Sequence, residues 1–264
     1  MLKINGKVVG DETYPNGETI MYSDVGITDL IMSFELKFEN DSDLFNLMMY
    51  KKYVDEKYPN TQKCLIMRYI PYSRMDRKID GYIFSLKYFC QFINDLKFNQ
   101  VFVLDPHSSM SIGLLNNVSE LNISNLVNKA MLGKDIDYIF YPDAGACKRY
   151  SETLNLWKPY DYFYGNKKRN LQTGEIIDYE LVDCPNIKGK NILIVDDLCS
   201  KGFTFYNAAQ KLKQTGADKI YLYVSHCENS IYDGKLLIGD YLIERIYTTD
   251  SILTNFTSKK IVVL

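Results

Sequence analysis

The chain has 264 residues, which is enough to bury a sizeable hydrophobic core in one large domain or in two smaller ones. Hydrophobic residues make up 46% and charged residues 24%, and this balance excludes a disordered or fibrous protein. The formal net charge of −2 provides no basic field for a nucleic-acid backbone, so we expect no nucleic-acid partner.

The cysteines and the apolar runs predict the cellular compartment. The six cysteines are scattered without C-x-x-C spacing, and several lie inside apolar runs, which predicts reduced thiols and a cytoplasmic location. No run approaches the roughly 18 apolar residues needed to span a bilayer. The N-terminus, MLKINGKVVGDE, also lacks an apolar core of signal-peptide length. We therefore expect no membrane contact and no export.

Apolar runs rich in Ile, Val, Tyr and Phe predict buried β-strands, and amphipathic segments of helical length lie between them. The predicted strands are Cys64–Ile70, Val101–Leu104, Tyr138–Tyr141, Ile192–Val195, Ile220–Val224 and Ile261–Leu264. The predicted helices are Asp41–Glu56, Ser85–Leu96, Ser124–Leu132 and Thr204–Thr215, with Gly216 as a C-cap. Strands that alternate with helices predict an α/β fold, with two doubly wound halves and mainly parallel sheets.

Two irregular stretches interrupt this alternation. Gly113–Ser124 contains two adjacent Asn and two Ser, and it predicts the boundary between an N-terminal domain, 1–120, and a C-terminal domain, 121–264. Gly165–Asn191 has no clean period and mixes Lys, Asn, Gly and Pro, which predicts a long and partly mobile excursion.

Charged residues follow two predicted strands of the N-terminal half, where ligands bind in doubly wound folds. In IPYSRMDR, Arg74, Asp76 and Arg77 come after a strand, and guanidinium forks match phosphate oxygens. In VFVLDPHS, Asp105 and His107 come after the next strand. Taken alone, the charged residues more commonly form an exposed turn, and a lone histidine is more commonly structural than a ligand.

The C-terminal half offers oxygen ligands and cations. Asp143 follows the strand Tyr138–Tyr141 and precedes a turn of small residues, where a hard oxygen ligand would suit Mg²⁺. The segment NKKRN places Lys167 and Arg169 at the start of the second irregular stretch. A basic triplet in a loop is more commonly solvated surface.

A pair of acids, Asp196 and Asp197, follows the apolar run Ile192–Val195. Carboxylates accept hydrogen bonds from sugar hydroxyls or bind Mg²⁺, and the amides at a helix N-terminus bind phosphate. The alternative is a solvated turn in which an Asp caps the next helix. Gly202 and Thr204, which precede or open that helix, favour a ribose phosphate ligand.

The segment Val195–Phe205, VDDLCSKGFTF, resembles the ribose-phosphate-binding motif of the type I phosphoribosyltransferase fold. With the other quoted motifs, the chain is most similar to the phosphoribosyl pyrophosphate synthetase family, or ribose-phosphate diphosphokinases. Members of that family transfer the β,γ-diphosphate of Mg-ATP to the anomeric hydroxyl of ribose 5-phosphate. The resemblance implies two phosphoribosyltransferase-like domains, of which the N-terminal one binds ATP and the C-terminal one binds ribose phosphate.

The resemblance also implies which residues bind ATP. Arg74 and Asp76 lie in the ATP-binding motif, and His107 matches a histidine that contacts Mg-ATP, although Met75 replaces the usual glutamine. The segment YPNGET resembles a loop that reaches the adenine of a neighbouring subunit; its Glu18 matches the family, and Asn16 replaces the usual Asp. This likeness implies a homo-oligomer with a shared active site.

The resemblance further implies the catalytic groups and the metal ligands. The family has a flexible loop with a Lys and an Arg two residues apart that close over the transferring diphosphate, and these correspond to Lys167 and Arg169. Cations placed on developing phosphoryl charge supply most of the catalysis in such transfers. With His107 they are the predicted catalytic residues, and His107 and Asp143 are the predicted ligands of Mg²⁺.

The ribose-phosphate loop departs from the family pattern. The predicted ribose-phosphate-binding residues are Asp196, Asp197, Ser200, Lys201, Gly202, Phe203 and Thr204. Ser200 replaces an acid, Lys201 adds a cation, and Phe203 places a ring where the backbone should approach phosphate closely. A longer acceptor such as ADP-ribose could use both, the ring by stacking and the lysine by charge. We therefore predict ribose 5-phosphate or ADP-ribose as the acceptor, with AMP released in either case.

Two other functions remain compatible with these motifs. A phosphoribosyltransferase that consumes the activated sugar would share the acid pair, but it would not need Arg74, His107 and the Lys167–Arg169 segment together. A catalytically inactive regulatory protein of the same fold would tolerate Met75, Asn16 and the altered loop.

Overall fold

The structure, a computed structural model, describes residues 1–26, 30–169, 176–237 and 242–264, and only the backbone of residues 167–169 and 176–178. The chain forms two compact units, Met1–Asn122 and Ile123–Leu264. Each unit has its own sheet and its own hydrophobic core. The predicted fold class, α/β with mainly parallel sheets, is confirmed. No helix in the described ranges is both long and apolar enough to cross a membrane.

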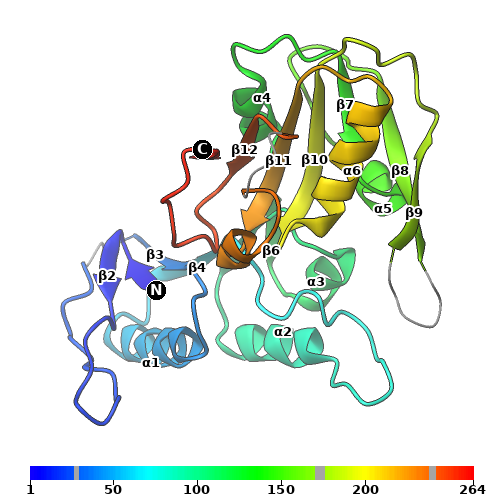
Figure 1. Ribbon diagram of the computed structural model, residues 1–264. Coiled ribbons are helices and arrows are strands. Elements are labelled where there is room, and N and C mark those ends of the chain that lie inside the picture. The colour runs from blue at the N-terminus through cyan, green and yellow to red at the C-terminus, as the bar shows by residue number, and fades with distance from the viewer. Residues whose placement is uncertain (27–29, 170–175, 238–241) are drawn as a thin grey trace. The chain divides into compact units, whose positions relative to one another are not determined.

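The first unit is built on a sheet whose strands are mostly parallel. Its strands are β1 (Leu2–Ile4), β2 (Lys7–Val9), β3 (Ile31–Leu36), β4 (Gln62–Met67), β5 (Gln100–Leu104) and β6 (Val118–Leu121). They lie in the order β2-β1-β3-β4-β5-β6, and β3 to β6 pair in parallel, whereas β1 is antiparallel to both of its neighbours (Figure 1).

In its described residues the first unit has three helices, and the longest of them, α1, buries an apolar stripe. They are α1 (Ser42–Lys57), α2 (Ser85–Asp95) and α3 (Ser109–Leu114). On α1 the residues Leu47, Tyr50 and Val54 recur at helical spacing and are buried in one core with Phe34 and Leu65 of the sheet. Burial of each such side chain contributes about 1.5–3 kcal/mol. This packing fixes the sheet from which the predicted ATP-binding residues follow.

The second unit has a larger sheet. Its strands are β7 (Tyr138–Tyr141), β8 (Tyr162–Arg169), β9 (Ile176–Val182), β10 (Ile192–Cys199), β11 (Ile220–Cys227), β12 (Arg245–Thr248) and β13 (Ile261–Val263). They lie in the order β13-β12-β11-β10-β7-β8-β9, and every pair is parallel except β8 with β9.

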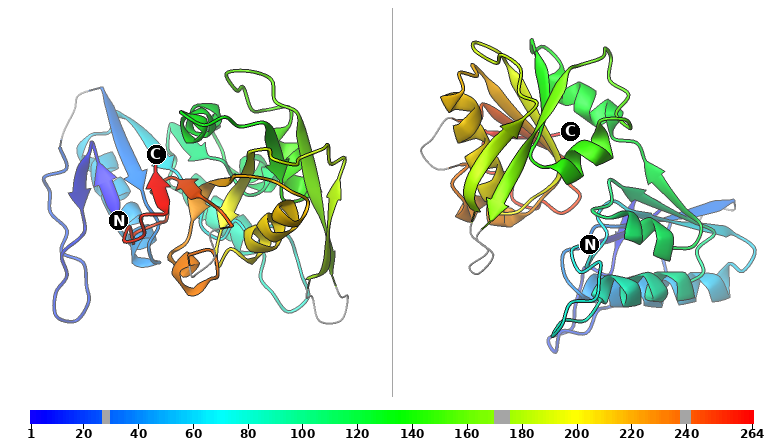
Figure 2. Two further views of the ribbon diagram at one scale, coloured as in Figure 1. Left: turned by 45° about the horizontal axis from the view of Figure 1, so that its top comes forward. Right: turned by 90° about the vertical axis from the view of Figure 1, so that its right-hand side faces the viewer.

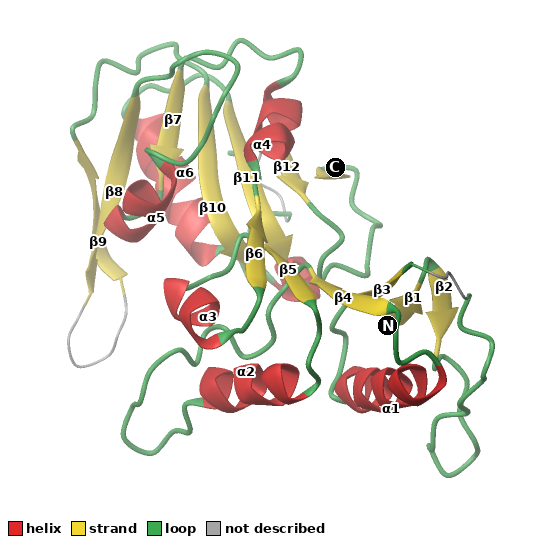
Figure 3. Cartoon of the chain, turned by 180° about the vertical axis from the view of Figure 1, so that it is seen from behind, coloured by secondary structure: helices red, strands yellow, loops and turns green. Residues whose placement is uncertain are grey.

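Helices cover both faces of this second sheet. They are α4 (Ser124–Met131), α5 (Ala144–Tyr150) and α6 (Phe203–Gln214), and a 3₁₀ turn, η1 (Asn229–Asp233), follows β11. Figures 1 and 3 show α6 on one face and α4 with α5 on the other. The core on the α6 side gathers Phe205, Ala208 and Leu212 of that helix with Ile192 and Ile194 of β10.

The predicted helices correspond to α1, α2, α4 and α6, with ends that differ by one residue. The first irregular stretch contains more regular structure than its sequence indicates. The units divide between Asn122 and Ile123, within Gly113–Ser124, but the same stretch also contains strand β6.

The stretch Gly165–Asn191 was predicted to be a long and partly mobile excursion because it has no clean period, but most of its described residues form regular structure. They form the end of β8 and the whole of β9, an antiparallel hairpin at one edge of the second sheet (Figure 2). Edge strands tolerate charged side chains, so the hydrophobic period that marks a buried strand is missing there.

Candidate active site

Three acidic residues of the second unit lie at one edge of its sheet. Strands β7 and β10 are parallel neighbours, so their carboxyl ends meet at that edge. Asp143 follows β7 closely. Asp196 and Asp197 were predicted to follow their strand, but β10 continues to Cys199, so both acids lie within the strand near its end.

Asp143 also stabilises the start of α5. It is the N-cap residue of the helix, and its Oδ1 atom accepts a hydrogen bond of 2.9 Å from the amide of Ala146. A side-chain cap of this kind stabilises a helix by about 1 kcal/mol. The small residues after Asp143 leave room for it, since a Cβ atom on Gly145 would lie 3.1 Å from the same oxygen. The carboxylate is thus held in a fixed orientation.

The acid pair on β10 is electrostatically crowded. The amide of Asp197 donates a hydrogen bond of 2.9 Å to Oδ1 of Asp196. Burial raises the pKa of the Asp196 carboxyl well above its usual range, and the carboxyl of Asp197 and the charge of Asp143 raise it further. A site that disfavours its own negative charge in this way suits a cation or hydrogen-bond donors such as sugar hydroxyls.

Arg149 was missed by the sequence analysis, although it lies only six residues after Asp143, at the end of the segment Tyr141–Arg149, YPDAGACKR. It lies in the last turn of α5, and its Nη1 atom is 3.5 Å from Oδ2 of Asp197. The side chain of Asp197 is 8% exposed and that of Arg149 is 30% exposed. The guanidinium also lies over the ring of Tyr150, at 5.7 Å from the ring centroid. A short helix therefore connects Asp143 at its start with Asp197 at its end.

The loop before α6 is fixed by hydrogen bonds to the segment after β11. The hydroxyls of Ser200 and Ser230 are 3.0 Å apart, and Ser230 donates a hydrogen bond of 2.8 Å to Oε2 of Glu228. Sequence reasoning assigned no role to Ser230 or Glu228, because only the parallel pairing of β10 with β11 brings them beside the loop. Ser200, which replaces an acid, is therefore linked to an acid through a second serine.

Two glycines make this loop possible. Gly202, the N-cap residue of α6, has a φ of +75°, and a Cβ atom there would collide with the side chain of Leu236. A Cβ atom on Gly234 would collide with the carbonyl oxygen of Lys201. Both positions therefore require glycine if the loop is to keep this path.

Replacing Gly202 with alanine is expected to lower the free energy of unfolding by about 1–3 kcal/mol. The positive φ would strain the alanine backbone, and the added methyl group would collide with the side chain of Leu236. Chemical denaturation measures the change. Gly113→Ala is the matched control, because Gly113 lies in α3 with no positive φ and open space around a Cβ atom. A Gly202→Ala protein as stable as the control would contradict the loop geometry.

Phe203 opens α6 with a largely solvent-exposed ring. Its exposed fraction is 51%, and Lys201 in the same loop is also exposed. The helix N-terminus beside them offers backbone amides that attract anions. An aromatic face and an ammonium group are therefore accessible next to the predicted phosphate-binding loop.

The predicted residues of the first unit follow neighbouring strands. Arg74 and Asp76 lie in the turns after β4, and His107 lies shortly after β5, which pairs in parallel with β4. Asp105, between β5 and His107, is buried and has a φ of +40°. Residues that follow adjacent parallel strands leave the same edge of the sheet, as the sequence analysis assumed.

The segment YPNGET forms an exposed hairpin in the first unit. Thr13 and Thr19 form an antiparallel bridge, and the amide of Tyr14 donates a hydrogen bond of 2.8 Å to the carbonyl of Glu18. The Asn16 side chain accepts a hydrogen bond of 3.2 Å from the amide of Glu18. An aspartate at this position could accept the same hydrogen bond through a carboxylate oxygen. The replacement of the usual Asp by Asn16 is therefore compatible with this turn.

Lys167 and Arg169, the predicted catalytic cations, lie at the end of β8 rather than in a loop. In the hairpin ladder Lys167 is opposite Tyr179 and Arg169 is opposite Ile176. The side chains of both cations lie outside the described part of the structure.

The donors at the sheet edge fit Mg²⁺, which the predicted reaction requires. Among the described residues, no group of three or more His, Cys, Asp and Glu side chains is arranged to enclose a metal ion. Mg²⁺ usually keeps several waters and takes only one or two protein carboxylates, so it needs no such cage. The mutual repulsion of Asp143, Asp196 and Asp197, visible in the raised pKa of Asp196, favours a cation beside them.

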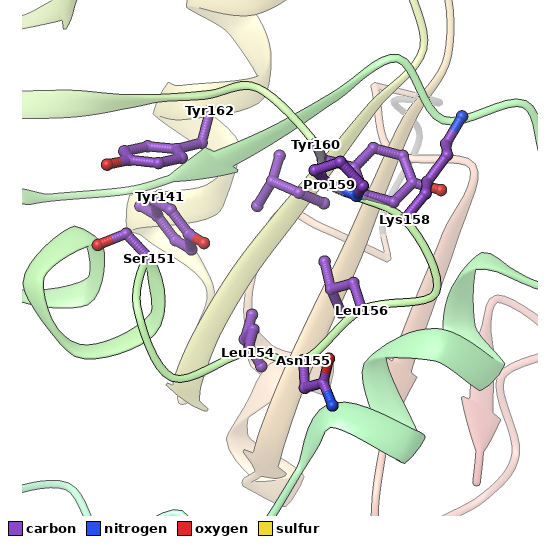
Figure 4. A pocket seen from close by; sticks show the side chains of 10 residues that line it. Tyr141, Ser151, Leu154, Asn155, Leu156, Lys158, Pro159, Tyr160 and Tyr162 are labelled. Carbon is purple, nitrogen blue, oxygen red and sulfur yellow. The ribbon is translucent and has the colours of Figure 1, made fainter.

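A cavity of about 370 Å³ lies in the same unit but holds none of the predicted site residues. Figure 4 shows Tyr141 of β7 and Tyr162 of β8 on one side of it, and Lys158 and Tyr160 on the other. The rings of Tyr141 and Tyr162 pack edge to face, with centroids 5.6 Å apart. We assign the candidate active site to the acidic sheet edge and not to this cavity.

Known proteins similar to this chain include phosphoribosyl transferases and ribose-phosphate pyrophosphokinases. The model of the phosphoribosyl transferase domain matches residues 122–243. A ribose-phosphate pyrophosphokinase of Thermococcus kodakarensis is 32% identical over 170 residues, which cover 61% of this chain and 57% of that protein. A protein of the same name from Sulfolobus acidocaldarius is 27% identical, and the alignment covers 96% of this chain and 85% of the relative. The chain thus matches just over half of the first relative and most of the second.

A solved structure matches both units. The crystal structure of phosphoribosylpyrophosphate synthetase from Mycobacterium smegmatis covers 96% of this chain, and this chain covers 84% of it, with a TM-score of 0.74 and 16% sequence identity. At that identity the likeness establishes the fold, and it supports two phosphoribosyltransferase-like halves.

Proposed function

We propose that this chain, which is similar to ribose-phosphate pyrophosphokinases over most of its length, is an enzyme of the phosphoribosyl pyrophosphate synthetase family that transfers the β,γ-diphosphate of ATP to the anomeric hydroxyl of a ribose 5-phosphate group. The observation that carries the proposal is the meeting of Asp143, Asp196 and Asp197 beside the start of α6. Carboxylates beside a helix N-terminus suit a ligand with hydroxyls at one end and a phosphate at the other.

The second unit supplies the groups that hold the acceptor. Asp196 and Asp197 accept hydrogen bonds from the ribose hydroxyls, and the amides at the start of α6 bind the phosphate. Arg149, whose Nη1 atom is 3.5 Å from Oδ2 of Asp197, pairs with that carboxylate and holds it turned toward α5. The acceptor is thereby oriented before the reaction, which is worth several kcal/mol in a two-substrate transfer.

The first unit supplies the donor site. Arg74 binds phosphate oxygens through its guanidinium fork, and Asp76, Glu18 and Asn16 complete the contacts to ATP. His107 also contacts the nucleotide. The exposed hairpin of Asn16 and Glu18 serves the ATP site of a second copy, so the enzyme is a homo-oligomer.

In the reaction the anomeric oxygen forms a bond to the β-phosphorus and loses its proton. The bond from that phosphorus to the oxygen of the α-phosphate breaks, and AMP leaves with the electron pair. Lys167 and Arg169 stabilise the negative charge that develops on the transferring group. When bound, Mg²⁺ neutralises phosphate charge; Asp143 is the predicted ligand of such an ion in the second unit, and His107 is the predicted ligand in the first.

The finer proposal concerns the acceptor, which is ribose 5-phosphate or the larger ADP-ribose. The ring of Phe203 at the start of α6 is 51% exposed, so it is accessible for stacking. This favours an acceptor that extends beyond its phosphate. Incubation with Mg-ATP and each sugar, followed by mass spectrometry, tests both. The proposal predicts AMP together with phosphoribosyl pyrophosphate or ADP-ribose pyrophosphate. It fails if neither sugar gains a diphosphate and no AMP forms.

Replacing Phe203 with alanine tests the extended acceptor. If adenine stacks on this ring, KM for ADP-ribose should rise about 10-fold, because base stacking on an aromatic side chain contributes about 1–3 kcal/mol. KM for ribose 5-phosphate should change less than about twofold. Phe256→Ala is the matched control, since Phe256 is 54% exposed in the same unit. Equal changes for both sugars would rule out stacking on Phe203.

A phosphoribosyltransferase is the second candidate, because the acid pair and the loop before α6 would serve it equally. It would release diphosphate from the activated sugar rather than AMP from ATP, so the same product analysis separates the two. A catalytically inactive protein of this fold would give neither product.

A further inference from the structure

Tyr179 connects the two parts of the second unit to which catalytic roles were assigned. It lies on β9 opposite Lys167 of β8 in the hairpin ladder. Its side chain is buried, with 6% exposed, and its hydroxyl donates a hydrogen bond of 2.7 Å to the carbonyl oxygen of Pro142. Pro142 is the residue before Asp143, so a single side chain links the hairpin to the turn that carries the acid.

Neighbouring residues on β7 and β8 constrain the ring and the hydroxyl of Tyr179. A Cβ atom on Gly165 would collide with the Tyr179 hydroxyl, so β8 has a glycine where the ring crosses it. The ring packs against Phe140 of β7, with centroids 6.5 Å apart. Burial raises the pKa of the Tyr179 hydroxyl, and the charges of Asp143 and Asp196 add to the effect, so the hydroxyl lies within electrostatic reach of both acids.

We propose that Tyr179 is a positioning residue, which sets the backbone of Lys167 relative to the turn of Asp143 through its hydrogen bond to Pro142. The inference rests on the proposed function, because that function assigns Lys167 to the transferring diphosphate and Asp143 to the Mg²⁺ bound beside it. Along the hairpin itself, β8 and β9 are joined by their antiparallel ladder. A displacement of about 1 Å between reacting groups can lower turnover about 100-fold.

A purely structural role for Tyr179 makes a different prediction. Loss of a buried hydrogen bond lowers the free energy of unfolding by about 1–3 kcal/mol wherever it occurs, because the carbonyl partner is left unsatisfied. Such a loss would leave the turnover of the folded enzyme unchanged. A positioning role requires lower kcat with KM largely retained, together with a hairpin that opens more often.

The experiment compares Tyr179→Phe with Tyr53→Phe in the full chain. Tyr53 is the matched control, because its hydroxyl donates to the backbone carbonyl of Ser23 at 3.3 Å in the other unit. For Tyr179→Phe we expect kcat about 10-fold lower, KM for ATP and for the sugar within about twofold, and faster amide hydrogen exchange in β8 and β9. The control should retain kcat and exchange in those strands.

Unchanged kcat with unchanged exchange in the hairpin would overturn the inference, and so would a rise in KM with kcat retained. Gly165→Ala offers a second variant that displaces the same hydroxyl without removing it, and it should shift kcat and exchange in the same direction. If the wild-type protein transfers no diphosphate at all, the proposed function fails. Hydrogen exchange in the two variants then still shows whether Tyr179 holds the hairpin, so the two failures can be told apart.

Discussion

Replacing Lys167 with alanine is expected to lower kcat about 100- to 1,000-fold while KM for ATP stays within about threefold. The reason is that charge accumulates on the transferring diphosphate mainly in the transition state. A cation that acts there changes turnover more than ground-state binding. The position of Lys167 is consistent with this role, since its backbone lies opposite Tyr179, whose hydroxyl contacts the turn of Asp143. Steady-state rates of AMP formation at saturating sugar measure the effect.

Lys168→Ala is the matched control for Lys167→Ala. It removes the same charge from the residue between the two candidate cations, so nonspecific loss of positive charge from the hairpin would affect both variants equally. The control should keep kcat within about threefold of the wild type. Equal losses in both variants would show that the hairpin provides only a general positive field, and retained turnover in Lys167→Ala would remove Lys167 from the mechanism.

Periodicity was sufficient to predict the buried part of the fold. The runs Tyr138–Tyr141 and Ile220–Val224 lie within β7 and β11, because strands covered on both faces must be apolar at nearly every position. The helix predicted at Thr204–Thr215 differs from α6 by one residue at each end, since Gly202 and Gly216 mark where the chain leaves helical geometry.

Edge strands were not predictable in the same way. Strand β8 ends in NKKR, residues 166–169, a sequence that suggests solvent and a loop, and its partner β9 is the last strand of the sheet. At an edge, pairing through the backbone is enough to hold a polar strand, so side-chain pattern carries little information. The first-unit strand β6, within a stretch rich in Asn and Ser, also lies at an edge of its sheet.

A residue of the candidate site could be predicted only where the same short segment also contains the apolar run that predicts the neighbouring strand. Asp143 and the pair Asp196–Asp197 stand next to apolar runs, so their place at strand ends follows from the sequence alone. Arg149 and Tyr179 could not be found in this way. Their partners are Asp197 and Pro142, and those contacts depend on β10 pairing with β7 and on the β8–β9 hairpin. Pairings over such separations are a property of the topology rather than of local pattern.

Replacing Arg149 with glutamine is expected to lower the free energy of unfolding by about 1–3 kcal/mol, less than for a fully buried ion pair because Arg149 is 30% exposed. We also expect turnover to fall about 100-fold, since Asp197 then lies beside Asp196 without its cation and the pair no longer holds the acceptor in one orientation. Chemical denaturation and steady-state kinetics give the two values independently. Lys148→Gln, the neighbouring exposed position on α5, is the matched control.

The double variant Arg149→Gln, Asp197→Asn separates stability from catalysis. Removing the carboxylate charge together with the guanidinium relieves the repulsion with Asp196, so most of the lost unfolding free energy should return. Turnover should not return, because a side-chain amide at this position cannot replace a carboxylate in accepting hydrogen bonds from two ribose hydroxyls. Recovery of both quantities would mean that Arg149 only neutralises charge. Recovery of stability alone would mean that turnover depends on the Asp197 carboxylate itself and not only on the balance of charge around it.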